Sequence, residues 1–482
     1  MTIGILAAGA YIPRLRLPRK LIAQANSWIN PALAGQAKGE RAICNWDEDA
    51  VTMAVEAARD ALTGREREAI GDLLFASTTF PFIDRLNAGI VAEALNLPSS
   101  VATLDIGGTQ RAATSALRNA LRTRSETLVV AAEKRQAKAA SPVEMSSGDA
   151  AAAILIGEGE PIARLVGSAT VTADFVDHYR TEESEYDYQW EERWIRDAGY
   201  LRIVPPVIAD CLKQAEVAAA DITHFVMPTT LSKVANAVAK AAGITESAIA
   251  DNLHAGCGDS GAAHPLFMLV AALEKAKGGE HVLVVGFGQG VDVLLFAIDK
   301  PLPAIEGRRG VAGHLARRHE HTNYVKYLAF NDLIEVERGM RAEVDKMTPL
   351  SALWRNRDAV TRFVGGACRN CGTLQFPKSR ICVNPNCAAV DSQDPHPFAE
   401  KIGRINSYTA DRLTYSPDPP ACYGMVQFDE GGRWMMDFTD VEAGDLQVGT
   451  PMRMTFRIKD IDQQRGFRRY FWKAAPAGEG RT

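Results

Sequence analysis

Four of the eight cysteines lie within twenty residues of one another, and this cluster constrains the fold more than any other feature. Two residues separate Cys368 from Cys371, ten residues follow, and four separate Cys382 from Cys387. Two such thiolate pairs on knuckle turns can close a tetrahedral shell of four sulfurs around zinc, and Gly372 suits the tight turn after the second ligand. A closed shell leaves no position for water, so we predict a structural zinc. The alternative is four cysteines that share no ligand.

The length and the charge balance exclude several classes of protein. With 482 residues, 46% of them hydrophobic and 23% charged, the chain is too long for a small binding module and too apolar to be mainly disordered. Its 54 Lys and Arg residues are balanced by 59 Asp and Glu residues. We therefore expect no nucleic acid as a partner and a small molecule as the substrate.

The sequence contains no apolar run long enough to cross a bilayer. Residues 3–12 are apolar but lack a preceding basic residue and a convincing cleavage site, so we interpret them as a first buried strand and not as a signal peptide. We expect a cytoplasmic protein with no membrane contact. Reduced thiols in that compartment favour a metal over disulfides for the clustered cysteines.

Residues 1–300 alternate short apolar runs with amphipathic stretches, a pattern typical of an α/β fold. The apolar runs predict buried strands at 72–76, 127–132, 151–156, 224–227 and 281–285. The amphipathic stretches predict helices at 48–62, 88–95, 111–121, 234–242 and 262–276.

The two halves of this region resemble each other. Residues 73–79 resemble 225–230, since each segment ends a predicted strand with Thr-Thr. The Gly-rich turns at 107–117 and 256–264 follow at similar distances, and each leads into an Ala-rich helix. Two related βα halves that share a layered core explain this pattern, with chance similarity of apolar strands as the alternative.

We expect four parts in the chain. Two halves at 1–157 and 158–300 form a body, a polar helical connector spans 301–360, and a small domain with the cysteine cluster occupies 361–482. In this last domain, alternating segments separated by Pro, Gly and Asp predict a small β-barrel with Tyr470, Phe471 and Trp472 in its core. The alternating segments are 403–409, 424–428, 433–438 and 451–457.

Several motifs of the body resemble the thiolase superfamily: Asp47–Ala58, the Asp105-x4-Gln110-x3-Thr114 turn and helix, Ser147–Ala153 and Gly286–Gly290. Within it, the chain is most similar to hydroxymethylglutaryl-CoA synthases and type III ketoacyl synthases. The small domain resembles the rubredoxin-like zinc ribbon plus OB-fold proteins that accompany thiolase-like acyl-CoA enzymes. The resemblance implies an α/β protein with a five-layered αβαβα body, a C-terminal zinc ribbon and an OB-fold β-barrel. It also implies a homodimer that uses acyl-CoA substrates, with coenzyme A as cosubstrate.

The chain departs from these enzymes at their catalytic positions. Gln110 stands where the synthases carry the nucleophilic cysteine, Thr78 where hydroxymethylglutaryl-CoA synthases carry a glutamate, and Pro228 where the histidine of the second half would fall. Asp259 replaces the asparagine of a Gly-Asn turn. An acyl-cysteine intermediate at the usual place is therefore not available.

Cleavage of a carbon–carbon bond beside a carbonyl does not require this cysteine. The oxyanion pocket of the superfamily, where two Gly-rich turns converge, can still stabilise an enolate. The thiol of coenzyme A can itself attack a β-keto carbonyl, or a base can start a retro-aldol reaction from a β-hydroxyl group. A glutamine at this place is also similar to decarboxylating ketosynthase variants.

Candidate acid and base groups lie beside the Gly-rich turns and in the polar, aromatic segment 177–200. The predicted catalytic residues are His264, Asp259, His178, Tyr200 and Gln110. For His264, Asp259 and the neighbouring His254, the alternative is a capping or buried structural role. For His178 and Tyr200, the alternative is an exposed helical face.

The predicted contacts of coenzyme A are Gly288, Gly290, Arg111 and Lys233. Arg111 has two alternatives: an ion pair with Glu144 or Asp149, or a contact with a substrate carboxylate. Cys257 lies in a Gly-rich turn near a helix N-terminus, where it is either a relocated nucleophile or a small buried core residue.

Our first hypothesis is a Cys-less acyltransferase of the thiolase type. It uses coenzyme A to cleave a β-keto acid or β-ketoacyl thioester, in catabolism of an aromatic side chain for example. The alternatives are a retro-aldolase acting on a β-hydroxyacyl-CoA and a non-catalytic acyl-CoA-binding scaffold subunit, which the loss of three catalytic positions favours.

Overall fold

The computed structural model describes residues 2–478, which divide into two compact units. The first unit contains the chain up to Leu333 apart from two short segments, Trp46–Glu48 and Glu93–Asn96, and the second contains these segments and the chain from Ile334 onward. The boundary falls inside the connector expected at 301–360. The reason is that β14 (His319–Glu320) pairs with β2 (Leu15–Pro18) of the first unit, and Tyr327 is buried in a core cluster of that unit.

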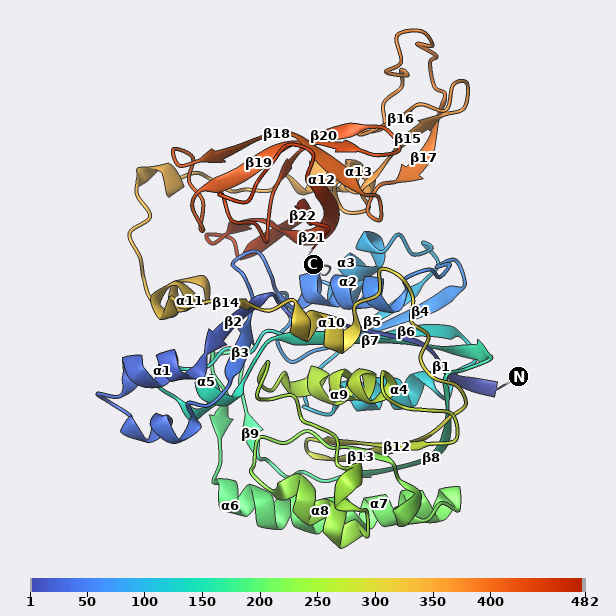
Figure 1. Ribbon diagram of the computed structural model, residues 1–482, viewed down its shortest axis with the longest axis vertical. Helices are drawn as coiled ribbons and strands as arrows, with labels where there is room; N and C mark the ends of the chain where they lie inside the picture. Colours follow the sequence, from blue (N-terminus) through green and yellow to red (C-terminus); the bar gives the residue numbers. More distant parts are fainter. Residues whose placement is uncertain (1, 479–482) are drawn as a thin grey trace. The chain divides into compact units, whose positions relative to one another are not determined.

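Nine strands form one continuous hydrogen-bonded sheet in the first unit (Figure 1). In spatial order they are β11 (His224–Val226), β12 (His281–Phe287), β13 (Gly290–Ile298), β8 (Ala163–Thr172), β1 (Thr2–Tyr11), β7 (Ala150–Gly159), β6 (Glu126–Glu133), β4 (Ile70–Ala76) and β5 (Ala102–Ile106). β1 pairs with β7 along its length but with β8 at only two positions, so the sheet bends there into two layers. Each half contributes one layer, as the duplication predicts.

Helices occupy three levels around the two sheet layers (Figure 1). α4 (Ala112–Ala120) and α9 (His264–Leu273) lie between the layers, and α9 is buried on every side, as expected for a helix covered by sheet on both faces. α2 (Ala50–Ala61) and α10 (Gly310–Ala316) cover one outer face, and α7 (Leu201–Ala215) and α8 (Val234–Ala242) cover the other. The five-layered αβαβα body predicted from the sequence is confirmed.

The local sequence explains how α2 begins and how closely it packs. Asp49 accepts a hydrogen bond from the backbone of Thr52, whose side chain contacts Asp49 in return, which closes a capping box. A Cβ on Gly9 of β1 would lie 2.2 Å from the Ala61 nitrogen, so only glycine allows this approach. All ten predicted elements of the body are present, and their ends differ from the prediction by at most three residues.

Shorter elements complete the first unit. They are α1 (Arg19–Asn26), β3 (Glu40–Ile43), α3 (Asn87–Ala94), α5 (Pro142–Ser146), β9 (His178–Tyr179), β10 (Tyr188–Gln189), α6 (Glu192–Trp194), a π-helical turn at Ile195–Tyr200 and α11 (Tyr324–Phe330). β9 and β10 form an antiparallel hairpin in which His178 pairs with Gln189. This hairpin lies within the polar, aromatic segment that the sequence marks.

The second unit contains a small three-stranded sheet and a barrel-like sheet, shown in orange and red in Figure 1. The small sheet has the order β16 (Leu374–Gln375), β15 (Val364–Cys368), β17 (Gln393–Pro397), and the larger has the order β20 (Arg433–Asp437), β19 (Ala421–Phe428), β18 (Gly403–Asp411), β21 (Pro451–Asp462), β22 (Phe467–Pro476). A bridge between Phe438 and Ala474 brings the two edges together. The predicted zinc ribbon and OB-fold are confirmed, and Tyr470 and Trp472 are buried as predicted. Phe471 is only half-buried, because it faces a cavity and not the barrel core.

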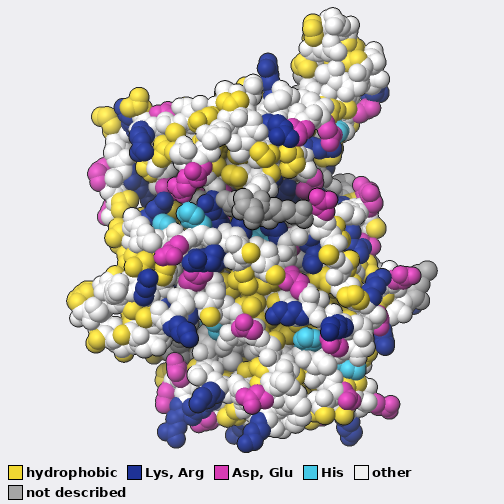
Figure 2. Space-filling view, viewed as in Figure 1, with side chains coloured by type: hydrophobic (Ala, Val, Ile, Leu, Met, Phe, Trp, Pro, Cys, Tyr) yellow, Lys and Arg dark blue, Asp and Glu magenta, His cyan; other side chains and the backbone are white. Residues whose placement is uncertain are grey.

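Among residues 2–478, no helix is both long and apolar enough to span a membrane. On the face drawn in Figure 2, basic and acidic side chains are interspersed and form no continuous basic band. This distribution agrees with the near balance of charges in the sequence.

Candidate active site

Two Gly-rich turns converge on Gln110, which lies between β5 and the start of α4. A Cβ on Gly261 would be 2.8 Å from Gln110 Oε1, and a Cβ on Gly288 would be 3.0 Å from the Gln110 backbone nitrogen. Because Gly261 has no side chain, it leaves space for the Gln110 side chain. Because Gly288 has none either, the backbone of that turn can approach the Gln110 backbone nitrogen closely. The turns that contain Gly261 and Gly288 therefore both approach this glutamine.

His178 of the β9–β10 hairpin reaches Gln110. The Nε2 atoms of the two side chains are 3.2 Å apart, and His178 Nδ1 lies 3.1 Å from Asp177 Oδ1. Asp177 Oδ1 has no hydrogen-bond partner within residues 2–478, whereas the Gln110 amide N–H donates to His178 Nε2. Asp177 therefore lies beside one nitrogen of the imidazole, and the other nitrogen points to Gln110. The exposed helical face considered for His178 does not describe this geometry.

Asp187 anchors the hairpin to the body through Arg135 and also pairs with Arg180 within the hairpin segment. Its carboxylate lies 2.5 Å from Arg135 Nη2 and 3.1 Å from Arg180 Nη1. Burial lowers the pKa of Arg135, but Asp187, Asp259 and Glu133 raise it above its ordinary value. Arg135 is therefore a fixed cation, and through Asp187 it holds the hairpin that carries His178. Sequence reasoning missed Arg135 and Asp187, although Asp187 lies inside the segment it singled out.

Asp259 lies among three basic groups and not at a helix cap. Its carboxylate oxygens are 3.7 Å from His254 Nε2, 3.8 Å from His264 Nδ1 and 3.8 Å from Arg135 Nη1. Burial alone would raise the pKa of Asp259, but these neighbours hold it well below the usual range. Asp259 is thus a permanent carboxylate that compensates Arg135. Ser260 directly precedes the short 3₁₀ turn Gly261–Ala263, so the capping role considered for Asp259 is wrong.

His254, Asp259 and His264 also have the spacing of a metal site, because one ligand atom of each lies within 4.8 Å of the others. The donor set does not fit a metal. His264 Nδ1 accepts a hydrogen bond from the Ser260 backbone N–H at 3.0 Å, and Nε2 donates to the Asn252 carbonyl at 2.8 Å. Both imidazole nitrogens are therefore engaged, which makes His264 a buried structural residue in one tautomer.

His264 should make folding stability depend on pH. Burial lowers its pKa from 6.5 to about 4, so below pH 6.5 the unfolded chain binds a proton that the folded chain does not. Stability from this group is present above pH 6.5 and is lost as the pH falls through 4. We expect the free energy of unfolding to drop by about 2 kcal/mol between pH 6.5 and 4.5 because of His264. Urea unfolding of the wild type and of His264→Gln measures this contribution. Equal pH slopes in the two proteins would contradict it.

The remaining predicted residues, Tyr200, Gly290 and Lys233, have different surroundings. Tyr200 stacks on Phe287 at 4.1 Å between ring centroids, and burial raises its pKa, so it is a packed ring and not part of an exposed face. Gly290 has a φ of 124°, and its carbonyl accepts a hydrogen bond from the Gly288 N–H at 3.0 Å. Lys233 is exposed at the residue before α8, and no hydrogen bond or ion pair described for residues 2–478 joins it to Gln110 or His178.

Arg111 holds the turn at Gly286–Gly290 in place. Its Nε donates to the Gly288 carbonyl at 2.9 Å, and its Nη1 lies 3.0 Å from Asp292 Oδ1. Neither ion pair considered for Arg111 forms, because the Glu144 and Asp149 carboxylates accept hydrogen bonds from other groups. Arg111 positions the turn beside Gln110.

Cys257 has the properties of a core residue. It is 1% exposed, its thiol lies 3.2 Å from the Leu253 carbonyl as a donor, and burial raises its pKa to about 12. A thiol in this environment stays protonated and is a poor nucleophile. The alternative of a small buried cysteine therefore describes it.

The four clustered thiols of the second unit fit a zinc ion. Cys368 Sγ lies 3.9 Å from Cys387 Sγ, Cys371 Sγ lies 3.6 Å from Cys382 Sγ, and all four sulfurs lie within 4.8 Å of one another. Zn–S bonds of about 2.3 Å in a tetrahedron place the sulfurs about 3.8 Å apart. Four thiolates fill the shell, so such a zinc supports the fold and offers no position to a substrate.

Comparisons with known proteins agree with this architecture. Residues 212–298 match the model of the 3-oxoacyl-[acyl-carrier-protein] synthase III C terminal, residues 358–391 the ChsH2 rubredoxin-like zinc ribbon, and residues 398–457 the ChsH2 C-terminal OB-fold domain. Hydroxymethylglutaryl-CoA synthase of Methanosarcina barkeri is 27% identical over 342 residues, which are 68% of this chain and 97% of that protein. The same enzyme of Aeropyrum pernix is 28% identical and covers 60% of this chain and 82% of its own length. A crystal structure of HMG-CoA synthase complexed with CoA superposes with a TM-score of 0.60 at 19% identity and covers 71% of this chain and 93% of that chain.

The fold and the matched segments are similar to those of the thiolase superfamily, and the similar proteins are enzymes of its acyltransferase type. Within that superfamily the chain is similar to hydroxymethylglutaryl-CoA synthases and to 3-oxoacyl-ACP synthase III. It carries a zinc ribbon and an OB-fold of the ChsH2 type in the same polypeptide.

Proposed function

We propose that this protein cleaves a β-keto acid or β-ketoacyl thioester by a retro-Claisen reaction with coenzyme A as the acyl acceptor. One observation carries the proposal: His178, which lies beside Asp177, contacts Gln110, the residue that we align with the nucleophile of the synthases. A base at that position has no enzyme thiol to activate. The thiol of coenzyme A, arriving there as a substrate, gives this base its function.

The proposed reaction balances without a further reactant. His178 Nε2 takes the proton of the coenzyme A thiol, and the thiolate attacks the β-keto carbonyl. The bond between the carbonyl carbon and the α carbon then breaks, the electron pair forms an enolate, and the imidazolium returns the proton to the α carbon. A β-keto acid thus gives an acyl-CoA and a shorter carboxylate, and a β-ketoacyl thioester gives an acyl-CoA and a shorter thioester.

Gln110 supports this chemistry with both ends of its amide. The Nε2 end donates to His178, and Oε1 is buried with no hydrogen-bond partner within residues 2–478. A buried acceptor without a partner is costly, so a donor from a substrate improves the energy of the site. A thiol S–H that approaches His178 supplies such a donor before its proton is transferred.

The direct test incubates the purified full-length protein with coenzyme A and a panel of aryl and alkyl β-keto acids. Mass spectrometry should detect the new acyl-CoA. Tight binding of coenzyme A with no turnover of any panel member would overturn the proposal and favour a scaffold subunit. Cleavage of β-hydroxyacyl-CoA substrates alone would instead identify a retro-aldolase. Cys257→Ala should leave turnover intact, because the proposed nucleophile is coenzyme A.

Gly261→Ala should impair turnover much more than folding. The new methyl group would lie 2.8 Å from both Gln110 Oε1 and Arg135 Nη1, so it would displace the amide from His178. The positive φ of 54° adds a folding cost of about 1 kcal/mol. Gly279→Ala is the matched control, because Gly279 has a φ of 89° and open space around its Cβ position. Equal activities of the two variants, measured as kcat/KM, would show that the space beside Gln110 has no role.

A further inference from the structure

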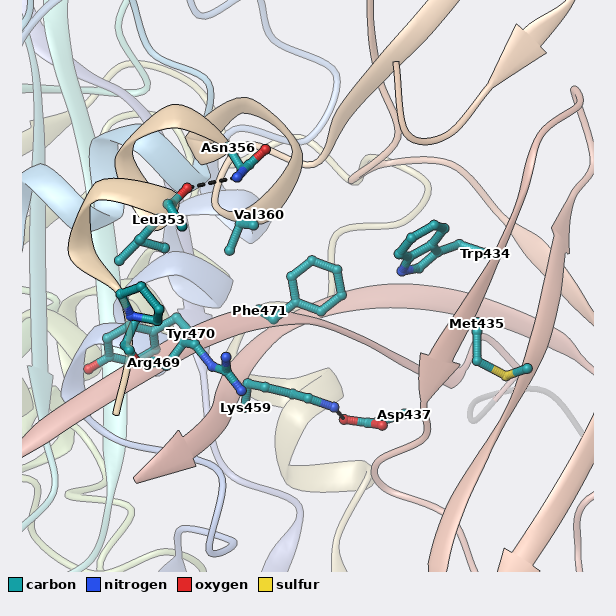
Figure 3. A pocket seen from close by; sticks show the side chains of 13 residues that line it. Leu353, Asn356, Val360, Trp434, Met435, Asp437, Lys459, Arg469, Tyr470 and Phe471 are labelled. Atoms are coloured by element: carbon teal, nitrogen blue, oxygen red, sulfur yellow. Dashed lines mark hydrogen bonds and ion pairs between the residues drawn. The ribbon is translucent and has the colours of Figure 1, made fainter. Parts of the chain in front are cut away.

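The second unit contains a cavity of about 400 Å³ that is separate from the Gln110 residues (Figure 3). It lies between the helices α12 (Leu350–Arg355) and α13 (Arg357–Val360) and the strands β20, β21 and β22. Aliphatic side chains of the helices form one wall, and aromatic side chains of the strands form the other. A cavity of this size with mainly apolar walls is typical of a small-molecule site.

Specific contacts hold the two walls in place. Trp472 Nε1 of β22 donates a hydrogen bond of 2.8 Å to the Thr361 carbonyl at the end of α13. Lys346, which precedes α12, donates from Nζ to Asp460 Oδ1 of β21 at 3.1 Å. The helices are therefore attached to the barrel at both ends of the helical segment, and the cavity between them is part of the folded structure.

One end of the cavity is charged. Lys459 pairs with Asp437, and Arg469 pairs with Asp460, which also accepts from Lys346. Three cations thus share two carboxylates, so this group carries one excess positive charge. Arg469 Nε is buried and has no hydrogen-bond partner within residues 2–478. Figure 3 shows Lys459 and Arg469 along the floor below Phe471 and Val360.

We propose that this cavity binds a small amphipathic carboxylate, that is, an aryl or alkyl acid. Its apolar part packs between Leu353 and Val360 on one side and Trp434 and Phe471 on the other, where ring stacking favours an aromatic group. Its carboxylate lies against the Arg469 guanidinium, which lines the cavity, and neutralises the excess positive charge. The site does not depend on the reaction proposed for Gln110 and His178.

Calorimetric titration of the full-length protein with 4-phenylbutanoate tests the proposal. The neutral 4-phenylbutan-1-ol and the cationic 4-phenylbutylamine have the same apolar part and serve as ligand controls. Arg469→Gln removes the unpaired donor and the charge. Arg404→Gln is its matched control, because Arg404 forms an exposed ion pair with Asp429 on the same sheet and does not line the cavity. Ala352→Phe fills the cavity from α12 without touching a charge.

We expect saturable binding of the carboxylate, about tenfold weaker in Arg469→Gln and unchanged in Arg404→Gln. We also expect the alcohol and the amine to bind at least about tenfold more weakly than the acid, and Ala352→Phe to lose this binding event while it keeps its circular dichroism spectrum. The proposal is overturned if the wild type does not bind the acid, or if the amine binds as well as the acid. It is equally overturned if Arg469→Gln and Ala352→Phe both bind as the folded wild type does.

Discussion

Replacing His178 with alanine is expected to lower kcat/KM for coenzyme A-dependent cleavage by about 10²–10⁴-fold, the usual contribution of a positioned general base. His178 provides the only imidazole nitrogen described within residues 2–478 that contacts Gln110. Without it the thiol must ionise unaided, and Gln110 loses its acceptor. The loss should fall mainly on kcat, because binding of coenzyme A does not require the base. Steady-state kinetics with a β-keto acid from the panel measures both constants.

His224→Ala is the matched control for this variant. His224 Nε2 lies 3.0 Å from Glu280 Oε2, so both variants remove a histidine from a histidine–carboxylate pair of the first unit. Only His178 contacts Gln110. Asp177→Asn should give a smaller loss, because it removes the carboxylate beside His178 and keeps the base itself. Equal activity of His178→Ala and His224→Ala would contradict the assignment of His178 as the base.

Cys382→Ser is expected to abolish zinc binding and to unfold the ribbon of β15, β16 and β17. Structural zinc contributes roughly 10–16 kcal/mol to the folding of zinc-finger peptides, and a three-thiolate site loses much of this. The ribbon sheet has only short strands to hold it otherwise. Metal analysis should find one zinc per chain in the wild type and almost none in the variant. Hydrogen exchange should show loss of protection over 364–397.

Cys422→Ser controls for the loss of a thiol in the same unit. Cys422 lies in β19, is half-buried and is not one of the clustered cysteines. It should keep its zinc and its exchange protection. A folded wild-type protein without zinc, or a Cys382→Ser variant with full protection of the ribbon, would overturn the assignment of a structural metal.

Features that depend on local sequence could be predicted. The spacing from Cys368 to Cys387 predicts the knuckles because zinc chemistry fixes how far apart the paired ligands are. The strands and helices of the body follow from hydrophobic periodicity, and the position of Gln110 follows from the Gly-rich turn before an Ala-rich helix. Each of these inferences requires only neighbouring residues.

The partners inside the site could not be predicted, because they are brought together by the fold. Arg111 finds Asp292, which is 181 residues away in sequence, whereas both carboxylates considered for it have other donors. The position of the hairpin that carries His178 depends on the ion pair between Arg135 and Asp187. The residues around Arg135 in the sequence do not indicate that it forms this ion pair. The one feature of the sequence that indicated a site residue was the adjacent acid and imidazole of Asp177 and His178.

The central strand of the body precedes its main partner strand by more than a hundred residues. Tyr11 of β1 pairs with Ala151 and Thr2 with Gly159, so the partners of this strand are synthesised 140–157 residues later. At roughly 5–20 residues per second, β1 waits about 7–30 seconds before it can pair with β7. The sheet layer of the first half cannot be completed until residue 159 has been synthesised. We therefore expect chaperones to bind the nascent chain most before that point.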